Sequence, residues 1–164
     1  MPSLTHPRQV IFVASRAKIE IMGNEVDKDD VIATTFHMPC SLNPREYCVS
    51  IPKKEFISGV IKISKVFSVN FVSIKMDKEA EILMNNSGEH FDKFLKAGID
   101  KEECEKIDCS RLKDALGYLE CEVINQVDTG DHIMFIGRVV NARLKKTDKR
   151  LFLKEHEEYT TTAD

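Results

Sequence analysis

The chain has 164 residues, a formal net charge of -3, 42% hydrophobic residues and 31% charged residues. This length allows one domain with a substantial core, so we expect a single domain over residues 1–164. The composition is typical of a soluble protein, and no apolar run approaches the roughly 20 residues that a membrane-spanning helix needs. The negative balance argues against a general nucleic-acid binder, whose surface would be basic.

The first seven residues contain no basic segment followed by an apolar one, so we expect no signal peptide and a cytoplasmic protein. Five cysteines, an odd number, are expected to be free thiols in a reducing compartment. Cys104 and Cys109 have no second pair or histidine at ligand spacing, so a zinc site is not expected. Cys48 and Cys121 lie in apolar runs and are predicted to be buried as small hydrophobic residues.

Apolar and β-branched runs dominate the first third of the chain. The acidic segment 27–30 is expected to be a loop between two strands. Pro39 and Pro44 predict irregular structure over residues 38–45, because proline has no N–H for a strand ladder. The predicted strands are residues 10–14, 18–22, 31–37 and 47–51.

The hydrophobic period changes after Pro52. Phe56 and Val60 are four residues apart, as in a short helix with one apolar stripe, and residues 67–72 then return to a strand pattern. Two short helices are predicted between residues 77 and 96, with a break around 85–88.

Residues 100–116 are predicted to contain helical turns. Asp100 followed by Glu103 is typical of a helix N-terminus. The apolar residues Leu112, Ala115 and Leu116 have helical spacing, which predicts a further helical turn after Ser110.

Two long strands, residues 118–127 and 133–144, are predicted to form a hairpin through the turn at 128–131. His132 then stands at the first residue of a strand, beside a loop, where sites are often built. Taken alone, this segment more simply indicates a turn histidine that faces water. With a last short strand at 151–153, about seven strands and a few short helices favour a closed or nearly closed antiparallel barrel with helical insertions.

The sequence contains none of the motifs G-x-G-x-x-G, G-x-x-x-x-G-K, G-x-S-x-G and H-E-x-x-H. A Rossmann fingerprint and a P-loop are therefore excluded, and any nucleotide must bind in another way. The five histidines are scattered without ligand spacing, so the sequence supports neither a hydrolytic triad nor metal catalysis.

Six segments, in this order, resemble the flavin reductase-like proteins with an FMN-binding split β-barrel, which include flavoredoxins and archaeal ferric reductases. The resemblance covers nearly the whole chain and implies a mainly β fold, a Greek-key antiparallel barrel with short inserted helices. The segments are HPRQV (6–10), ATTFHMPCSLNP (33–44), FSVNF (67–71), DKF (92–94), YLECEV (118–123) and GDHIMFIGRV (130–139).

The resemblance implies a homodimer with one noncovalent FMN per subunit near the dimer interface, and a redox function. Lys93 and His132 match positions that contact the flavin. Phe36 stands where the family often has a tryptophan beside the flavin, and Tyr159 where a C-terminal aromatic residue can cover the ring.

The chemistry of further residues agrees with these implied roles. A reduced, anionic flavin is stabilised by a positive or donating group such as Lys93 or His132. Met38, Pro39 and Cys40 belong to a segment that the resemblance places near the cofactor; Cys40 is expected to be a packed thiol, with a redox role as the alternative. The FMN phosphate needs cations and hydroxyl or amide donors. Candidates for these are Thr34, Thr35, Ser41, Lys53 and Lys54.

The chain departs from the family pattern at two places. Asp30 replaces an asparagine that the family often has near the flavin. A carboxylate at this position disfavours an anionic cofactor if the carboxylate faces the cofactor. The family's threonine before the lysine-rich helix is missing: Glu55, Phe56 and Ile57 occupy that neighbourhood, and only Ser58 could substitute.

Three functions stay open. The leading hypothesis is an FMN-dependent oxidoreductase that passes electrons from a nicotinamide or a protein donor through FMN to an acceptor. NADH or NADPH would then stack on the exposed flavin face, since no Rossmann motif is present. The alternatives are a flavoredoxin-type electron carrier without NAD(P)H oxidase activity, which would need a redox protein partner, and a split-barrel interaction module that has lost its flavin.

Overall fold

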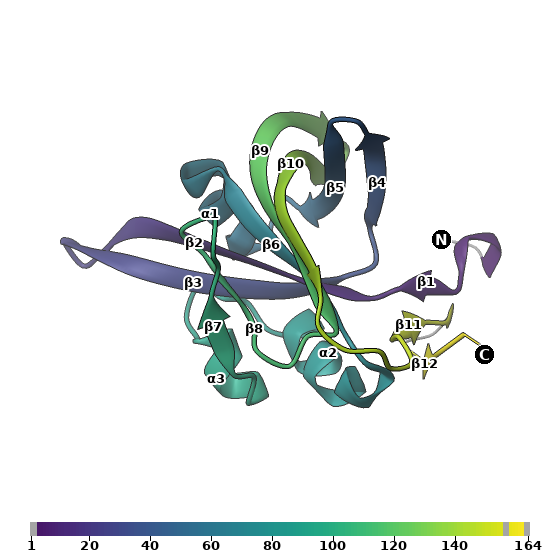
Figure 1. Cartoon of the computed structure of the whole chain (residues 1–164). Helices are drawn as coiled ribbons and strands as arrows, with labels where there is room; N and C mark the ends of the chain where they lie inside the picture. Colours follow the sequence, from purple (N-terminus) through teal and green to yellow (C-terminus); the bar gives the residue numbers. More distant parts are fainter. Residues whose placement is uncertain (1–2, 156–157, 163–164) are drawn as a thin grey trace.

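The computed structural model describes residues 3–155 and 158–162. Its main element is a seven-stranded antiparallel sheet with the order β3-β2-β6-β9-β10-β5-β4. In Figure 1, β9, β10, β5 and β4 bend away from β2 and β3, so that the sheet curls on itself. The strands are β2 (Ile11–Ile21), β3 (Asn24–Thr34), β4 (His37–Leu42), β5 (Arg45–Pro52), β6 (Val66–Phe71), β9 (Gly117–Thr129) and β10 (His132–Leu144).

Strand β10 lies in the curled part of the sheet and pairs with β9 on one side and β5 on the other. Its register with β9 shifts between Ile136 and Gly137, and again between Val139 and Asn141. Such bulges bend a strand and increase its twist. Gly137 permits a close approach at the bend, because a Cβ atom there would lie 2.7 Å from both Cys121 Cβ and Phe67 Cζ.

One hydrophobic cluster fills the curled sheet. It joins residues of β2, β3, β5, β6, β9 and β10 to Ile57 and Ile61 of α1 (Phe56–Ser64). These two residues are four apart, so they lie on the same face of the helix. The helix ends at Lys65, which has a φ of 61° and donates its N–H to Ile61 O over 2.8 Å.

A second cluster lies on the opposite face of β2 and β3. Phe12 and Val31 point into it, while their neighbours Val13 and Ile32 point into the first cluster, as strand alternation requires. The second face is covered by η2 (Ile74–Met76), α2 (Asp77–Met84) and α3 (Lys93–Ala97).

Short strands complete the fold. A three-stranded sheet joins the two ends of the chain, which lie together at the right of Figure 1, and a two-stranded sheet follows α3. Their elements are β1 (Arg8–Gln9), β11 (Phe152–Leu153), β12 (Tyr159–Thr160), β7 (Lys101–Glu103) and β8 (Ser110–Leu112), and η1 (Ser3–Thr5) precedes β1.

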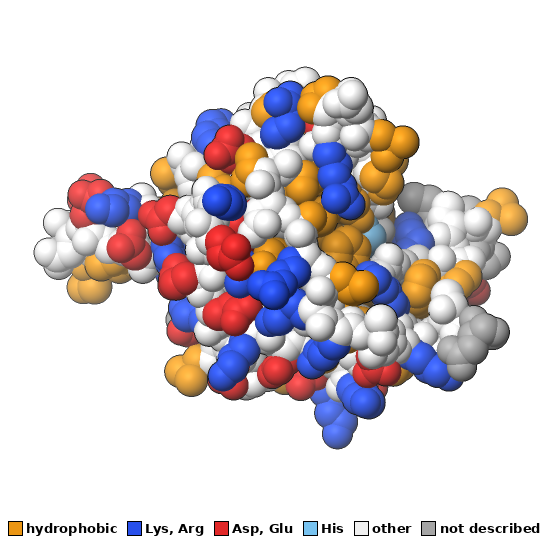
Figure 2. Space-filling view, in the orientation of Figure 1, with side chains coloured by type: hydrophobic (Ala, Val, Ile, Leu, Met, Phe, Trp, Pro, Cys, Tyr) orange, Lys and Arg blue, Asp and Glu red, His pale blue; other side chains and the backbone are white. Residues whose placement is uncertain are grey.

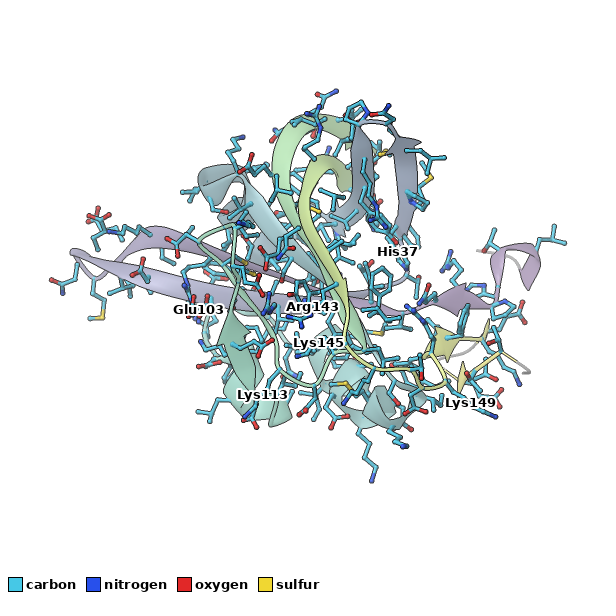
Figure 3. The ribbon with its side chains drawn as sticks, in the orientation of Figure 1. His37, Glu103, Lys113, Arg143, Lys145 and Lys149 are labelled. Carbon is cyan, nitrogen blue, oxygen red and sulfur yellow. The ribbon has the colours of Figure 1, made fainter. Side chains whose placement is uncertain are left out.

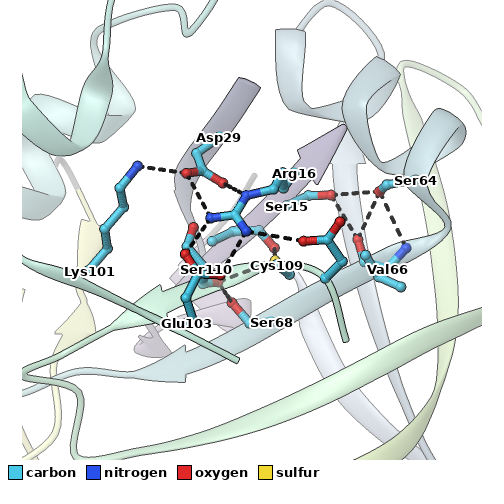
Figure 4. Close-up of polar contacts among 12 residues, drawn as sticks. Ser15, Arg16, Asp29, Ser64, Val66, Ser68, Lys101, Glu103, Cys109 and Ser110 are labelled. Atoms are coloured by element: carbon cyan, nitrogen blue, oxygen red, sulfur yellow. Dashed lines mark hydrogen bonds and ion pairs between the residues drawn. The ribbon is translucent and has the colours of Figure 1, made fainter. Parts of the chain in front are cut away.

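Ion pairs fasten the β7–β8 sheet to β2 and β3 (Figure 4). Arg16 binds Asp29 over 2.8 Å and Glu103 over 2.7 Å, and Lys101 binds Asp29 over 2.6 Å. The hydrogen bonds from Arg16 and Lys101 outweigh the effect of burial and hold the pKa of Asp29 below its usual value. Each carboxylate and cation in this group is therefore paired.

A buried ion pair fastens the same segment to β9. Arg111 binds Glu120 over 2.7 Å, and the Glu120 side chain is completely buried. Its two oxygens also accept the backbone N–H groups of Glu105 and Lys106, over 2.9 and 2.7 Å. These bonds supply the partners that a buried carboxylate needs.

Several sequence predictions are confirmed. The mainly β, antiparallel fold with short inserted helices is observed, as are α1, the two helices α2 and α3, and the β9–β10 hairpin with His132 at the start of its second strand. Cys48 and Cys121 are buried, at 3% and 0% exposure.

Two predictions in the first third of the chain are wrong. The expected acidic loop at 27–30 is part of β3, where Asp27 and Asp29 lie opposite Lys18 and Arg16 of β2. Opposite charges across a strand pair stabilise the pairing. The predicted strands 10–14 and 18–22 are likewise one continuous strand, β2.

The irregular structure predicted for residues 38–45 is also wrong for most of that segment, which forms β4. Pro39 is accommodated because β4 is the last strand of the sheet, with one edge free of a ladder. The register with β5 shifts between Pro39 and Ser41, so Cys40 is the extra residue of a bulge.

The helical turns predicted for residues 100–116 are β7, β8 and a turn. Glu102 and Arg111 face each other across the strand pair and form an ion pair of 2.9 Å. The apolar spacing of Leu112, Ala115 and Leu116 reflects burial of all three residues, not a helix. Within the described residues, none of the helices has the length and apolar character to cross a membrane.

Candidate functional site

Two aromatic rings meet where β3 ends and β10 begins. Phe36 follows β3, and its ring lies 5.0 Å from that of His132, centroid to centroid, with 17° between the planes. The Arg8 guanidinium lies 4.7 Å from the centre of the Phe36 ring. This stack provides a flat, partly exposed surface with a cation beside it.

The backbone holds Phe36 in place. Its N–H donates to Thr34 Oγ1 over 3.1 Å, and its carbonyl accepts the N–H of Ser50 over 2.8 Å. Thr34 itself is 8% exposed, so its hydroxyl serves this turn. Thr35 is half-buried and lines a neighbouring cavity.

His132 is oriented by its neighbour. Its Nδ1 lies 2.6 Å from Asp131 Oδ1, and since a carboxylate only accepts, Nδ1 carries the hydrogen. This hydrogen bond lowers the pKa of Asp131. The imidazole is 20% exposed, and its Nε2 forms no hydrogen bond with a described residue.

The turn before α1 lies beside this histidine. Pro52 is opposite His132 in the ladder, and the Lys53 N–H donates to Asp131 O over 2.8 Å. The side chains of Lys53 and Lys54 are exposed at the helix N-terminus, which carries the positive end of the helix dipole. Ser58 is 3% exposed and donates its hydroxyl to Lys53 O over 3.2 Å.

Asp30 and Lys93 are buried at the same edge of the sheet, at 1% and 2% exposure. Asp30 Oδ1 accepts the N–H of Val31 over 2.9 Å, whereas Oδ2 has no hydrogen-bond partner among the described residues. Burial raises the pKa of Asp30 to about 6, although the charge of Lys93 acts in the opposite direction. Burial lowers the pKa of Lys93, against the charges of Asp30 and Glu55.

The β4 candidates line the other end of the curled sheet. Met38, Pro39 and Cys40 are exposed, and Ser41 is half-buried. Burial and the charge of Glu46 raise the pKa of Cys40, which disfavours a reactive thiolate. The expectation of a packed thiol is wrong, because Cys40 is the extra residue of a bulge on the last strand of the sheet and its side chain is exposed.

Tyr159 lies in β12, on the three-stranded sheet. Its hydroxyl contacts Met84 Sδ over 3.6 Å, and its ring packs against the second hydrophobic cluster. The strand ladder relates it to Arg8, since Leu153 pairs with both residues. The structure therefore places Tyr159 in the sheet that carries Arg8.

A cavity of about 330 Å³ lies next to the stack, lined by residues that include Arg8, Thr35 and Met38. Two further lining residues form a fixed polar pair: His37 Nε2 lies 2.8 Å from Gln9 O, and Nδ1 lies 2.7 Å from Tyr47 Oη. A carbonyl only accepts, so Nε2 donates and Nδ1 accepts from the tyrosine. Burial lowers the pKa of His37, which favours this neutral form.

Sequence reasoning missed the roles of Arg8 and His37. Arg8 was only part of an opening segment, and His37 only the end of a strand. Their partners Phe36 and Tyr47 come from other segments of the chain, so no local pattern reveals these contacts. The signal that could have found Arg8 and His37 was the family resemblance, because they lie in its segments 6–10 and 33–44.

Comparisons with known proteins agree with this fold. A family model described as flavin reductase like domain matches residues 3–162. An uncharacterised protein of Archaeoglobus fulgidus is 28% identical over 116 residues, which cover 71% of this chain and 66% of that protein. The chain thus spans slightly less than two thirds of the length of that relative.

Solved structures share the fold. An FMN-binding protein from Thermus thermophilus with bound p-hydroxybenzaldehyde has 20% identity and a TM-score of 0.85, covering 99% of this chain and 90% of that one. A flavoredoxin from Methanosarcina acetivorans has 23% identity and a TM-score of 0.81, covering 96% and 86%.

The raised pKa of Asp30 predicts that this carboxyl group destabilises the protein above its pKa. A folded-state pKa above the unfolded value favours folding at low pH, and this contribution is lost as the pH rises from about 4 through about 6. At about pH 4, the free energies of unfolding of Asp30→Asn and the wild type should therefore differ only by an offset that does not depend on pH. At about pH 8 it should gain roughly 2–3 kcal/mol in the free energy of unfolding relative to that offset.

Urea unfolding of both proteins across this pH range measures the difference directly. Asp27→Asn is the matched control, because Asp27 is exposed on the same strand and should show no such pH-dependent gain. A constant difference between Asp30→Asn and the wild type would show that Asp30 titrates as an ordinary carboxyl group.

Proposed function

Because the chain belongs to the flavin reductase like domain family, we propose that it binds FMN noncovalently at the Phe36–His132 stack and works as an oxidoreductase. The observation that carries this proposal is the contact between the two rings, 5.0 Å apart, beside a turn that bears two lysines. A flavin has a flat ring system and a charged phosphate, so it needs both a ring surface and cations. The ring surface of Phe36 and His132 and the lysine-bearing turn lie side by side in this structure.

The residues present fit FMN in their chemistry. Lys53, Lys54 and the start of α1 would hold the phosphate, because cations and helix N-termini favour anions. The Glu55 side chain makes no capping hydrogen bond, so it does not satisfy the first N–H groups of the helix. Phe36 and His132 would hold the ring edge, with Lys93 as a further cation.

Each residue contributes binding or orientation. Asp131 fixes His132 with Nδ1 protonated, so Nε2 is left to contact a ligand. Arg8 holds positive charge beside Phe36, which favours an anionic ring. When bound, FMN supplies the electron-transfer chemistry.

The electron donor is part of the proposal. A nicotinamide would have to stack on the flavin, because the chain has no Rossmann fingerprint. The alternative is a carrier that exchanges electrons with another redox protein, as the likeness in fold to a flavoredoxin suggests. A barrel without flavin is the third possibility, favoured by the two carboxylates Asp30 and Glu55 near the candidate site.

The first test is FMN binding. Wild-type protein mixed with FMN should quench flavin fluorescence with a saturable, one-to-one endpoint. His132→Ala and Lys93→Met should each raise the dissociation constant roughly tenfold or more, since a hydrogen bond to a charged group contributes about 1.5–3 kcal/mol. His90 and Lys62 are exposed and provide matched controls. His90→Ala and Lys62→Met should leave the dissociation constant for FMN unchanged. Absence of FMN binding by the wild type would favour the flavin-free module.

A second test distinguishes enzyme from carrier. Protein loaded with FMN is mixed anaerobically with NADH or NADPH in a stopped-flow instrument, and the flavin absorbance is followed. We expect bleaching within seconds, in keeping with ordinary turnover numbers of about 1–10³ per second. Bound flavin that stays oxidised with both nicotinamides but is reduced by a ferredoxin would identify a carrier.

We also propose that the protein is a homodimer that covers the groove between β4 and β10. This groove has a volume of about 530 Å³ and meets the smaller cavity at Pro39 and Tyr47. Figure 2 shows hydrophobic side chains around a hollow in this region, and Figure 3 shows His37 near β4 and β5, and Arg143 near the lower end of β10. Leu42 and Leu144, which line the groove, are 90% and 62% exposed. A partner would cover this apolar surface and the free edge of β4.

Light scattering after gel filtration tests the dimer. The wild type should have twice the chain mass of 18.7 kDa. The double variant Leu42→Asp, Leu144→Asp should shift to the monomer mass, because it puts charge on the proposed interface. Leu95→Asp is a matched control, since Leu95 is 80% exposed on α3, away from the groove. A monomeric wild type at micromolar concentration would contradict the proposal.

A further inference from the structure

Asp30 has a free oxygen in a closed environment. Its side chain is buried, one oxygen accepts the Val31 N–H, and Oδ2 has no hydrogen-bond partner in the part of the chain that the structure describes. Gly88 covers it: a Cβ atom there would lie 2.0 Å from Asp30 Oδ1. Only glycine lets the loop after α2 come this close. A buried carboxylate without a partner is costly, so this oxygen requires a proton or a ligand.

The groups around Asp30 do not supply that partner. Ser15 lies opposite Asp30 in the ladder, but its hydroxyl donates to Val66 O over 2.7 Å. Lys28, on the same strand, donates to Phe91 O over 3.1 Å. Lys28, Lys93 of α3 and Glu55 before α1 act on Asp30 only through their charges.

Lys93 is also without a close partner. Its ammonium group forms neither a hydrogen bond nor an ion pair within 4.0 Å among the described residues, yet both Asp30 and Glu55 act on its charge. With both carboxylates ionised, the charges of Asp30, Glu55 and Lys93, together with Lys28, whose charge also acts on Asp30, sum to about zero. With a proton on Asp30, the same four groups have a net charge of about +1, which favours an anion nearby.

We propose that FMN binding is linked to a proton at Asp30: the FMN phosphate binds at the start of α1, on the side of Glu55 and Lys93, with uptake of one proton from solvent at Asp30 Oδ2. This inference rests on the proposed FMN binding. The proton removes one negative charge, and the O–H formed becomes a hydrogen-bond donor. Burial holds the pKa of Asp30 at about 6, so that protonation near neutral pH costs little free energy. Asp30 acts here as a proton-linked residue for binding and not as a catalytic group.

The test compares FMN affinity in wild type and Asp30→Asn as a function of pH, with flavin fluorescence as the readout. The dissociation constant of the wild type is divided by that of Asp30→Asn. This ratio removes the titration of the phosphate itself, whose second pKa is about 6. We expect a ratio near one at about pH 5 that rises to roughly tenfold or more by about pH 7.5, as one linked proton requires. Asp27→Asn should give a flat ratio against the wild type. Riboflavin, which lacks the phosphate, should also give a flat ratio.

A second measurement uses only the wild type, so it does not depend on the folding of a variant. Calorimetric titration of FMN at about pH 7.5, in two buffers that differ in heat of ionisation, reports the protons taken up. We expect about one per FMN bound. Tight FMN binding with a flat ratio and no proton uptake would overturn the inference and leave the proposed function intact. A pH-dependent ratio for riboflavin equal to that for FMN would overturn the role of the phosphate, and no FMN binding by either protein at any pH would remove the proposed function itself.

Discussion

The arrangement of the site depends on one strand, β10, which pairs along both of its edges. Its first residue, His132, lies opposite Thr129 of β9 and Pro52 of β5. The β9–β10 turn and the start of α1 are therefore neighbours in space, although about 75 residues separate them in the chain. A shift of one residue in either ladder would turn His132 away from Phe36. The register of the β9–β10 pair thus matters for the site as much as its bulges matter for the curvature of the sheet.

Two adjacent residues of β3 show how orientation decides the state of a carboxyl group. Asp29 meets Arg16 and Lys101 and is paired on both oxygens, which lowers its pKa. Asp30 points to the other face of the strand, where one oxygen has no partner and burial raises its pKa. The first carboxylate fastens the β7–β8 sheet. The second creates an electrostatic strain at the candidate site, of the kind that is often retained where a ligand binds.

The local elements could be predicted from the sequence, whereas their pairing could not. The spacing of Phe56 and Val60 was sufficient for α1, because a helix is stabilised within its own segment. Residues 27–30 look like a loop because the charges that balance them, on β2, come from a different segment. Among the site residues, Phe36 and His132 were candidates through family resemblance, but their contact depends on the β10 register. The burial of Asp30 depends on Gly88, 58 residues further along the chain, so no local pattern predicts it.

The joined ends of the chain have a mechanical consequence. Strand β11 pairs with β1 on one side and β12 on the other, through two residues in each ladder, while the barrel strands are held by ladders several times longer. A force that pulls the two ends apart would load these short ladders first and peel them before the barrel yields. Because Arg8 belongs to β1 and lies over Phe36, such tension would separate the guanidinium from the ring stack while the sheet stayed folded. Tension applied at the two ends would thus act on the site through Arg8 before it acts on the seven-stranded sheet.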